Sequence, residues 1–167
     1  MKAVFGFKRY LPSVFEKIQS EPSFFAIAPV EASIQVGHHL EALDYLLEAW
    51  CEAKGWNFHS LTEQIGFISP PNPFTEVNAA ASKLMYYPRT QLAAIVEMLE
   101  QMTLPEFEQI GDEVFQTLQV HPRPETPSAF ALNRRHLQET FTLVRTFFLE
   151  AHRTQDYVLL EVGFENP

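Results

Sequence analysis

The stretch DYVLLEVGF, residues 156–164, alternates side chains with the period of a β-strand. On one side it places Val158, Leu160, Val162 and Phe164, and on the other Tyr157, Leu159 and Glu161. One face is therefore fully apolar and the other partly so. This pattern predicts a C-terminal strand with one face buried and the other half-buried.

Helical patterns precede this strand, and a second strand lies at the other end of the chain. Val4, Phe5 and Phe7 indicate a strand over residues 3–7. Apolar residues at helical spacing predict helices over residues 35–54, over residues 88–102 behind Pro88, and over about 132–153. We expect one helix-rich α+β domain spanning residues 1–167, with a small sheet of the N- and C-terminal strands covered by helices. The pattern leaves the strand order open.

Shorter elements are predicted from local signals. Capping-box spacing at Ser13–Glu16 and Thr103–Glu106 predicts two helix starts, and the same spacing at Ser60–Glu63 predicts the start of a short element. The stretch FFAIA at residues 24–28 predicts a short buried strand or core-filling segment. Prolines predict a surface loop in the run SPPNP at residues 69–73 and an extended strap over residues 122–127. Asp112 is placed to cap a helical turn over residues 112–119.

The charge of the chain excludes several classes of partner. Twelve Lys and Arg against 21 Asp and Glu give a net charge of −9, which repels nucleic acid and anionic lipid. No apolar run approaches the roughly 20 residues that a membrane span needs. The stretch MKAVFGFKRYLP lacks a signal-peptide pattern. Cys51 is the only cysteine, so an intrachain disulfide is impossible and we expect a protein of the reducing cytoplasm.

Motifs of the common enzyme families are missing from the sequence. It contains no HExxH, GxSxG, GxGxxG or GxxxxGK pattern, and we predict neither a metal nor a cofactor. His38 and Glu41 share a helix face with Tyr45 and Glu48, which is more typical of a solvated face than of a metal site. The lone Cys51 is more typical of a small apolar core residue than of a nucleophile.

Two groups of residues remain as candidates for binding. Tyr86, Tyr87 and Arg89 precede a helix, where backbone N–H groups and a guanidinium can hold an anion, and His121 could join them from the proline strap with Arg123. The alternative for the two tyrosines is hydrophobic packing at the helix start.

The second group is the basic cluster at residues 134–136, near the start of the last helix. Arg134, Arg135 and His136 would pair either with acidic groups of this chain or with an acidic protein partner.

Four stretches give the chain a resemblance to a known family. They are LEALDYLL at residues 40–47, YYPRTQLAAIVEMLEQM from Tyr86, VHP at residues 120–122, and the final helix followed by DYVLLEV. Together with the N-terminal strand, these stretches resemble the YfbM-like family of bacterial domains of unknown function. The resemblance implies a single α+β domain and no particular activity.

These patterns favour a noncatalytic protein-binding module, which includes modules of the inhibitor or immunity type, as monomer or homodimer. The missing motifs and the net charge of −9 favour it over an enzyme, because acidic proteins suit the neutralisation of basic partners. The alternative is a small-ligand-binding protein or enzyme that uses a pocket near Tyr86, Arg89 and His121. A structure can test the geometry of that pocket.

Overall fold

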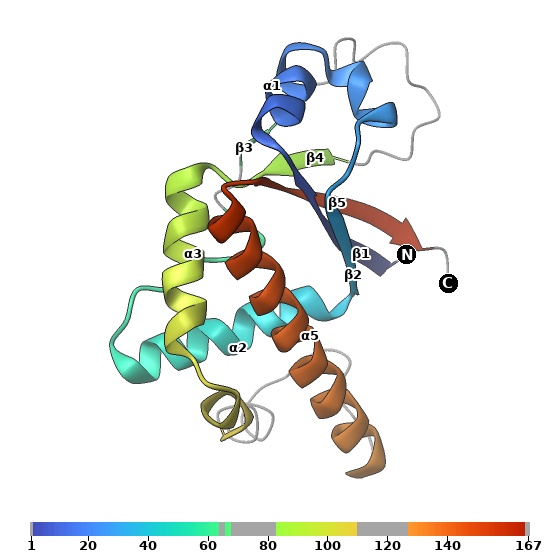
Figure 1. The fold of residues 1–167 in the computed structure, drawn as a ribbon. Helices are drawn as coiled ribbons and strands as arrows, with labels where there is room; N and C mark the ends of the chain where they lie inside the picture. Colours follow the sequence, from blue (N-terminus) through green and yellow to red (C-terminus); the bar gives the residue numbers. More distant parts are fainter. Residues whose placement is uncertain (1, 64–65, 68–82, 110–126, 166–167) are drawn as a thin grey trace.

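The chain folds around one antiparallel sheet in a computed structural model that describes residues 2–63, 66–67, 83–109 and 127–165 (Figure 1). The strand order is β2-β1-β5-β4-β3, and every neighbouring pair is antiparallel. The strands are β1 (Lys2–Tyr10), β2 (Ala32–Gly37), β3 (Gly66–Phe67), β4 (Lys83–Tyr86) and β5 (Tyr157–Glu165).

The two ends of the chain form the middle of the sheet. β1 pairs with β5 along their whole length, from Lys2 opposite Glu165 to Tyr10 opposite Tyr157. The predicted α+β class, with the terminal strands in one sheet, is therefore confirmed. The sheet is larger than the predicted one, because β2, β3 and β4 extend it on both sides.

Helices cover the two faces of the sheet unequally. The three longest lie on one face together with the short helix over residues 104–109, and the two N-terminal short helices lie at one end of the other face (Figure 1). The helices are α1 (Pro12–Ser20), the 3-10 helix η1 (Pro22–Ile27), α2 (His39–Lys54), α3 (Arg89–Gln101), a further helix over residues 104–109, and α5 (Pro127–Thr154). None within the described ranges combines the length and apolar character that crossing a bilayer requires.

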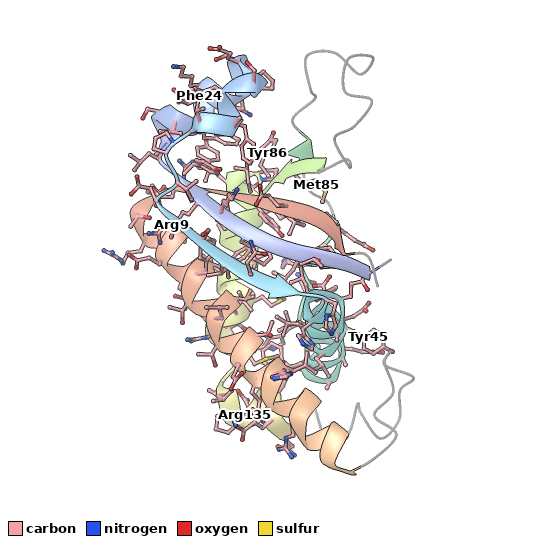
Figure 2. The ribbon with its side chains drawn as sticks, turned by 90° about the vertical axis from the view of Figure 1, so that its right-hand side faces the viewer. Arg9, Phe24, Tyr45, Met85, Tyr86 and Arg135 are labelled. Carbon is pink, nitrogen blue, oxygen red and sulfur yellow. The ribbon has the colours of Figure 1, made fainter. Side chains whose placement is uncertain are left out.

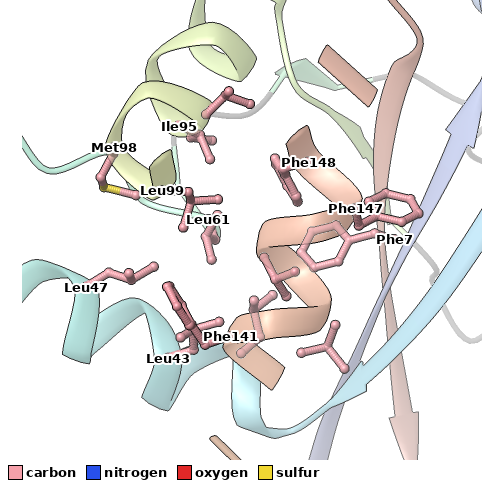
Figure 3. Packing of buried hydrophobic residues seen from close by; sticks show 14 of the residues in the cluster. Phe7, Leu43, Leu47, Leu61, Ile95, Met98, Leu99, Phe141, Phe147 and Phe148 are labelled. Carbon is pink, nitrogen blue, oxygen red and sulfur yellow. The ribbon is translucent and has the colours of Figure 1, made fainter. Parts of the chain in front are cut away.

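The main core lies between the sheet and the three long helices, and aromatic side chains fill its centre (Figure 3). Phe7 of β1 is fully buried and meets the edge of Phe148 at 5.2 Å between ring centroids. Phe107 stacks on Phe141 at 4.4 Å, which joins the helix at 104–109 to α5. Burial of large rings is the main stabilising contribution at this interface.

A second, smaller cluster covers the opposite face of the sheet beneath α1. Leu159 of β5 and Tyr10 of β1 are fully buried in it, and Phe15 of α1 stacks on Tyr157 at 4.0 Å. β5 therefore has buried side chains on both faces, as the sequence predicts.

The predicted C-terminal end of α2 and the predicted start of the helix at 104–109 are both confirmed by their hydrogen bonds. α2 ends at Gly55, whose φ of +69° is the left-handed conformation that favours glycine, and the Trp56 N–H donates to the Cys51 carbonyl at 2.8 Å. The Thr103 N–H donates to Glu106 at 3.0 Å, and the Glu106 N–H donates to the Thr103 hydroxyl at 3.4 Å, which closes a capping box.

The predicted start of α2 is wrong. The helix begins at His39 rather than at Gln35, because residues 32–37 form strand β2. Val36 is buried and Gln35 exposed, which is the alternation of a strand. Gly37, at φ +63°, makes the turn between strand and helix.

Two further local predictions need correction near the N-terminus. Residues 24–27 of FFAIA belong to η1, so the strand alternative is wrong, since Pro22 occupies the first turn of a short helix, where a proline is accepted. Phe24, Phe25 and Ala28 pack in the smaller cluster, as the core-filling alternative expects. α1 begins at Pro12 with Leu11 at its N-cap, so the Ser13–Glu16 box does not start it. The helix itself, of nine residues, matches the predicted two turns.

The short element predicted from the Ser60–Glu63 spacing is a turn. The Ser60 hydroxyl accepts the N–H groups of Thr62 and Glu63, both at 3.0 Å, but the chain continues as bends. The loop at 69–73, the turn at 112–119 and the strap at 122–126 lie outside the described residues, and Pro127 is the first residue of α5.

Asp44 of α2 holds this turn against the core. Its carboxylate accepts hydrogen bonds from the Leu61 N–H at 2.7 Å, the Ser60 hydroxyl at 2.5 Å and the Thr62 hydroxyl at 2.8 Å. Only 8% of Asp44 is exposed. Burial raises the pKa of Asp44, while the three donors act to lower it and do not fully compensate.

We expect Asp44→Ala to lower the free energy of unfolding by about 3 kcal/mol, because it leaves the buried Leu61 N–H without an acceptor. Urea denaturation measures the change. The adjacent Tyr45 is 43% exposed, so Tyr45→Ala should change stability by no more than about 0.5 kcal/mol. Equal losses in both variants would contradict this role for Asp44.

Asp44→Asn tests the raised pKa. A raised pKa in the folded state means that folding favours the protonated carboxyl, so its contribution is greatest below the ordinary pKa of 3.8. The stability of the unmodified chain relative to Asp44→Asn should fall as pH rises through the folded-state pKa. Urea titrations between about pH 4 and 7 measure this difference, and a difference that grows with pH would refute the assignment.

Candidate functional site

Tyr86 and Tyr87, which are neighbours in the chain, point to opposite faces of the sheet. Tyr86 packs on Phe15 at 5.1 Å in the smaller cluster. Tyr87 is fully buried in the main core, where its hydroxyl donates to the Leu61 carbonyl. Burial and the nearby Asp44 charge raise the pKa of Tyr87. The structure therefore does not bring the two phenol groups together.

Arg89 makes structural contacts between α3 and the segment that joins α5 to β5. Its Nη2 donates to the Gln155 carbonyl at 2.8 Å, and its guanidinium lies 4.2 Å from the ring centroid of Tyr157. These contacts tie the start of α3 to the turn between α5 and β5. Tyr86 and Arg89 thus lie near the same Phe15–Tyr157 stack, whereas His121 and Arg123 lie outside the described residues.

Three histidine rings meet where α2 begins. The His38 and His39 centroids are 4.2 Å apart, and His39 lies 5.5 Å from His136 of α5. Burial and the two neighbouring rings lower the pKa of His39. In the described residues no group of three His, Cys, Asp or Glu side chains is arranged to hold a metal ion. Glu41, Tyr45 and Glu48 are exposed along α2.

Cys51 is fully buried in the main core. Burial raises the pKa of its thiol to about 11, so the thiol is protonated at neutral pH. This environment suits packing rather than nucleophilic attack.

The basic cluster at residues 134–136 lies on α5, at the end of the molecule opposite Tyr86 (Figure 2). Arg135 pairs with Glu139 one turn along the helix at 2.9 Å, and both side chains are largely exposed. An exposed pair of this kind contributes little to stability.

A groove that the sequence patterns do not indicate runs between α5 and the start of the helix at 104–109. Two adjoining cavities form it, and we call it the α5 groove. The smaller cavity, about 320 Å³, is lined by Met102, Thr103, Leu104, Phe141, Thr142, Arg145 and Thr146. The larger one, about 580 Å³, shares Leu104, Thr142 and Thr146 and adds Arg135, Gln138, Glu139 and Leu143.

Exposed apolar side chains distinguish the α5 groove from an ordinary helix surface. Leu104 and Leu143 come from its two walls, and each is 41% exposed. Leu143 follows the buried Phe141 but lies off the apolar stripe of α5 that packs into the core. An apolar residue off the stripe is the signal that sequence reasoning could have used.

Comparison with known proteins supports the fold alone. No protein-family model matches the chain, and no curated protein matches its sequence. One solved structure, titled a protein of unknown function YfbM from Escherichia coli, matches with a TM-score of 0.50 and 10% identity, over 96% of this chain and 99% of that one. The chain therefore shares the fold of YfbM, and the resemblance predicted from its sequence is confirmed at the level of the fold.

Proposed function

We propose that the chain is a noncatalytic protein-binding module whose partner docks in the α5 groove. The observation that carries this proposal is that Leu104 and Leu143, two exposed leucines from different helices, line the same groove. Single exposed apolar residues are normal on a protein surface, whereas apolar residues gathered in a groove are typical of interaction sites.

The groove has the composition of a docking site. Phe141 and Met102 form a buried apolar floor, while Gln138, Glu139 and the threonines supply a polar rim. An apolar centre with a polar rim is the usual arrangement in protein interfaces. A partner side chain placed between Leu104 and Leu143 would remove the apolar surface of both from water, which favours association.

The polar residues of the groove support binding over catalysis. Thr103 is engaged in the capping box, Arg135 pairs with Glu139, and Arg145 donates to the Leu99 carbonyl. The lining also includes Glu139 and three threonines, but Glu139 is paired with Arg135 and the Thr103 hydroxyl is bonded to Glu106. A module that acts by covering its partner, as inhibitors and immunity-type proteins do, needs no free nucleophile or base.

Selection of peptides against the folded chain tests the site. Random 16-residue peptides displayed on phage are enriched on the immobilised protein, and each enriched peptide is measured against two variants. Leu143→Gln should weaken binding about tenfold or more, because it places an amide in the apolar centre. Ile27→Gln, the matched control at an exposed leucine-sized residue of η1, should leave binding unchanged.

Two results would overturn the proposal. One is that peptides enriched on the chain bind Leu143→Gln as tightly as the unmodified protein. The other is that no peptide is enriched above the support without protein. Circular dichroism of each variant controls for folding, and both substituted side chains are exposed enough to be replaced without loss of core packing.

A further inference from the structure

Arg145 stands where the smaller cavity meets the last turn of α3. Its Nε donates to the Leu99 carbonyl at 2.9 Å, which fixes the side chain between α5 and α3. That bond uses one of the five N–H groups of a guanidinium, and Arg145 also lines the cavity. A positioned, partly buried guanidinium loses less freedom on binding a guest than an extended surface side chain does.

Hydroxyl groups lie beside this arginine in the same cavity. Thr142 and Thr146 are one helical turn apart on α5, and both line the two cavities. A guanidinium next to hydroxyl donors matches the acceptors of a carboxylate, which arginine binds through two parallel hydrogen bonds. The apolar residues Leu104 and Leu143 adjoin this polar end of the groove.

The charge of the groove differs in sign from the charge of the chain. Its lining residues include Arg135 and Arg145 against Glu139, whereas the whole chain carries −9. The field of the distant acidic residues is screened over about 8 Å at physiological ionic strength. Because Arg135 is paired with Glu139, a guest carboxylate in the groove is governed chiefly by its direct contact with Arg145.

We propose that the partner inserts an acidic, apolar segment, in which an apolar side chain lies between Leu104 and Leu143 and a neighbouring Asp or Glu carboxylate pairs with Arg145. This inference rests on the proposed docking in the α5 groove and names the chemistry of its guest. The rest of the partner surface can be basic and face the acidic remainder of this chain.

Peptide sequences and a double-mutant cycle test the inference. Peptides enriched on the chain should contain an Asp or Glu close to an apolar residue. Replacing that acid by its amide should weaken binding to the unmodified protein about tenfold, but less than twofold to Arg145→Gln, since the pairing is then already lost. Isothermal titration calorimetry measures the four affinities.

Arg145→Gln also perturbs the bond to Leu99, so a thermal melt accompanies it, and Thr142→Val provides a second variant on the exposed rim of the groove. Thr142→Val should weaken the acidic peptide but not its amide form. Peptides that depend on Leu143 yet lack an acid, or that show no coupling to Arg145 or Thr142, would overturn this inference and leave the proposed docking intact. Failure to enrich any peptide would overturn both.

Discussion

The pairing of β1 with β5 is the constraint on which the other elements depend. It joins the two ends of the chain along nine residues and places β5 between β1 and β4, so that both edges of β5 are hydrogen-bonded. Val158 and Leu160 face the main core, and Leu159 faces the smaller cluster. A strand that is paired on both edges and buried on both faces has one register, because a slip by one residue would exchange its two faces.

The position of α5 follows from this pairing. Gln155, at φ +60°, turns the chain directly from α5 into β5, and Asp156 pairs with Arg9 of β1 at 3.0 Å. Arg89 and Arg145 then fix the two ends of α3 to this unit through the carbonyls of Gln155 and Leu99. The α5 groove is thus built on a helix that the Arg145–Leu99 bond ties to α3, which suits a site that binds without rearrangement.

The sequence predicts the elements whose pattern is long and regular, which are the three long helices and the terminal strands. The sequence pattern does not predict β2, because the alternating Ile34 and Val36 are followed almost at once by the first turn of α2. Gly37 is the one residue between them that signals a change of secondary structure. The pattern fails at β4 because a four-residue strand becomes one only by pairing with β5, a contact between residues that are distant in the chain. Asp44 shows the same limit, since its hydrogen-bond donors lie in a turn that is distant from it in the chain.

The candidate sites also depend on contacts between residues that are distant in the chain. Tyr87 and Arg89 have the chemistry of a binding site, but Tyr87 donates its hydroxyl hydrogen to the Leu61 carbonyl and Arg89 donates to the Gln155 carbonyl. The α5 groove needs Leu104 and Leu143 to line it from separate helices, which no local pattern reveals.

Methyl NMR of the protein with a selected peptide compares the tyrosine region and the α5 groove directly. The account predicts shifts at the Leu104, Leu143 and Thr142 methyl groups with Leu61 and Leu159 unchanged, whereas shifts confined to Leu61 and Leu159, beside the tyrosines, would contradict it.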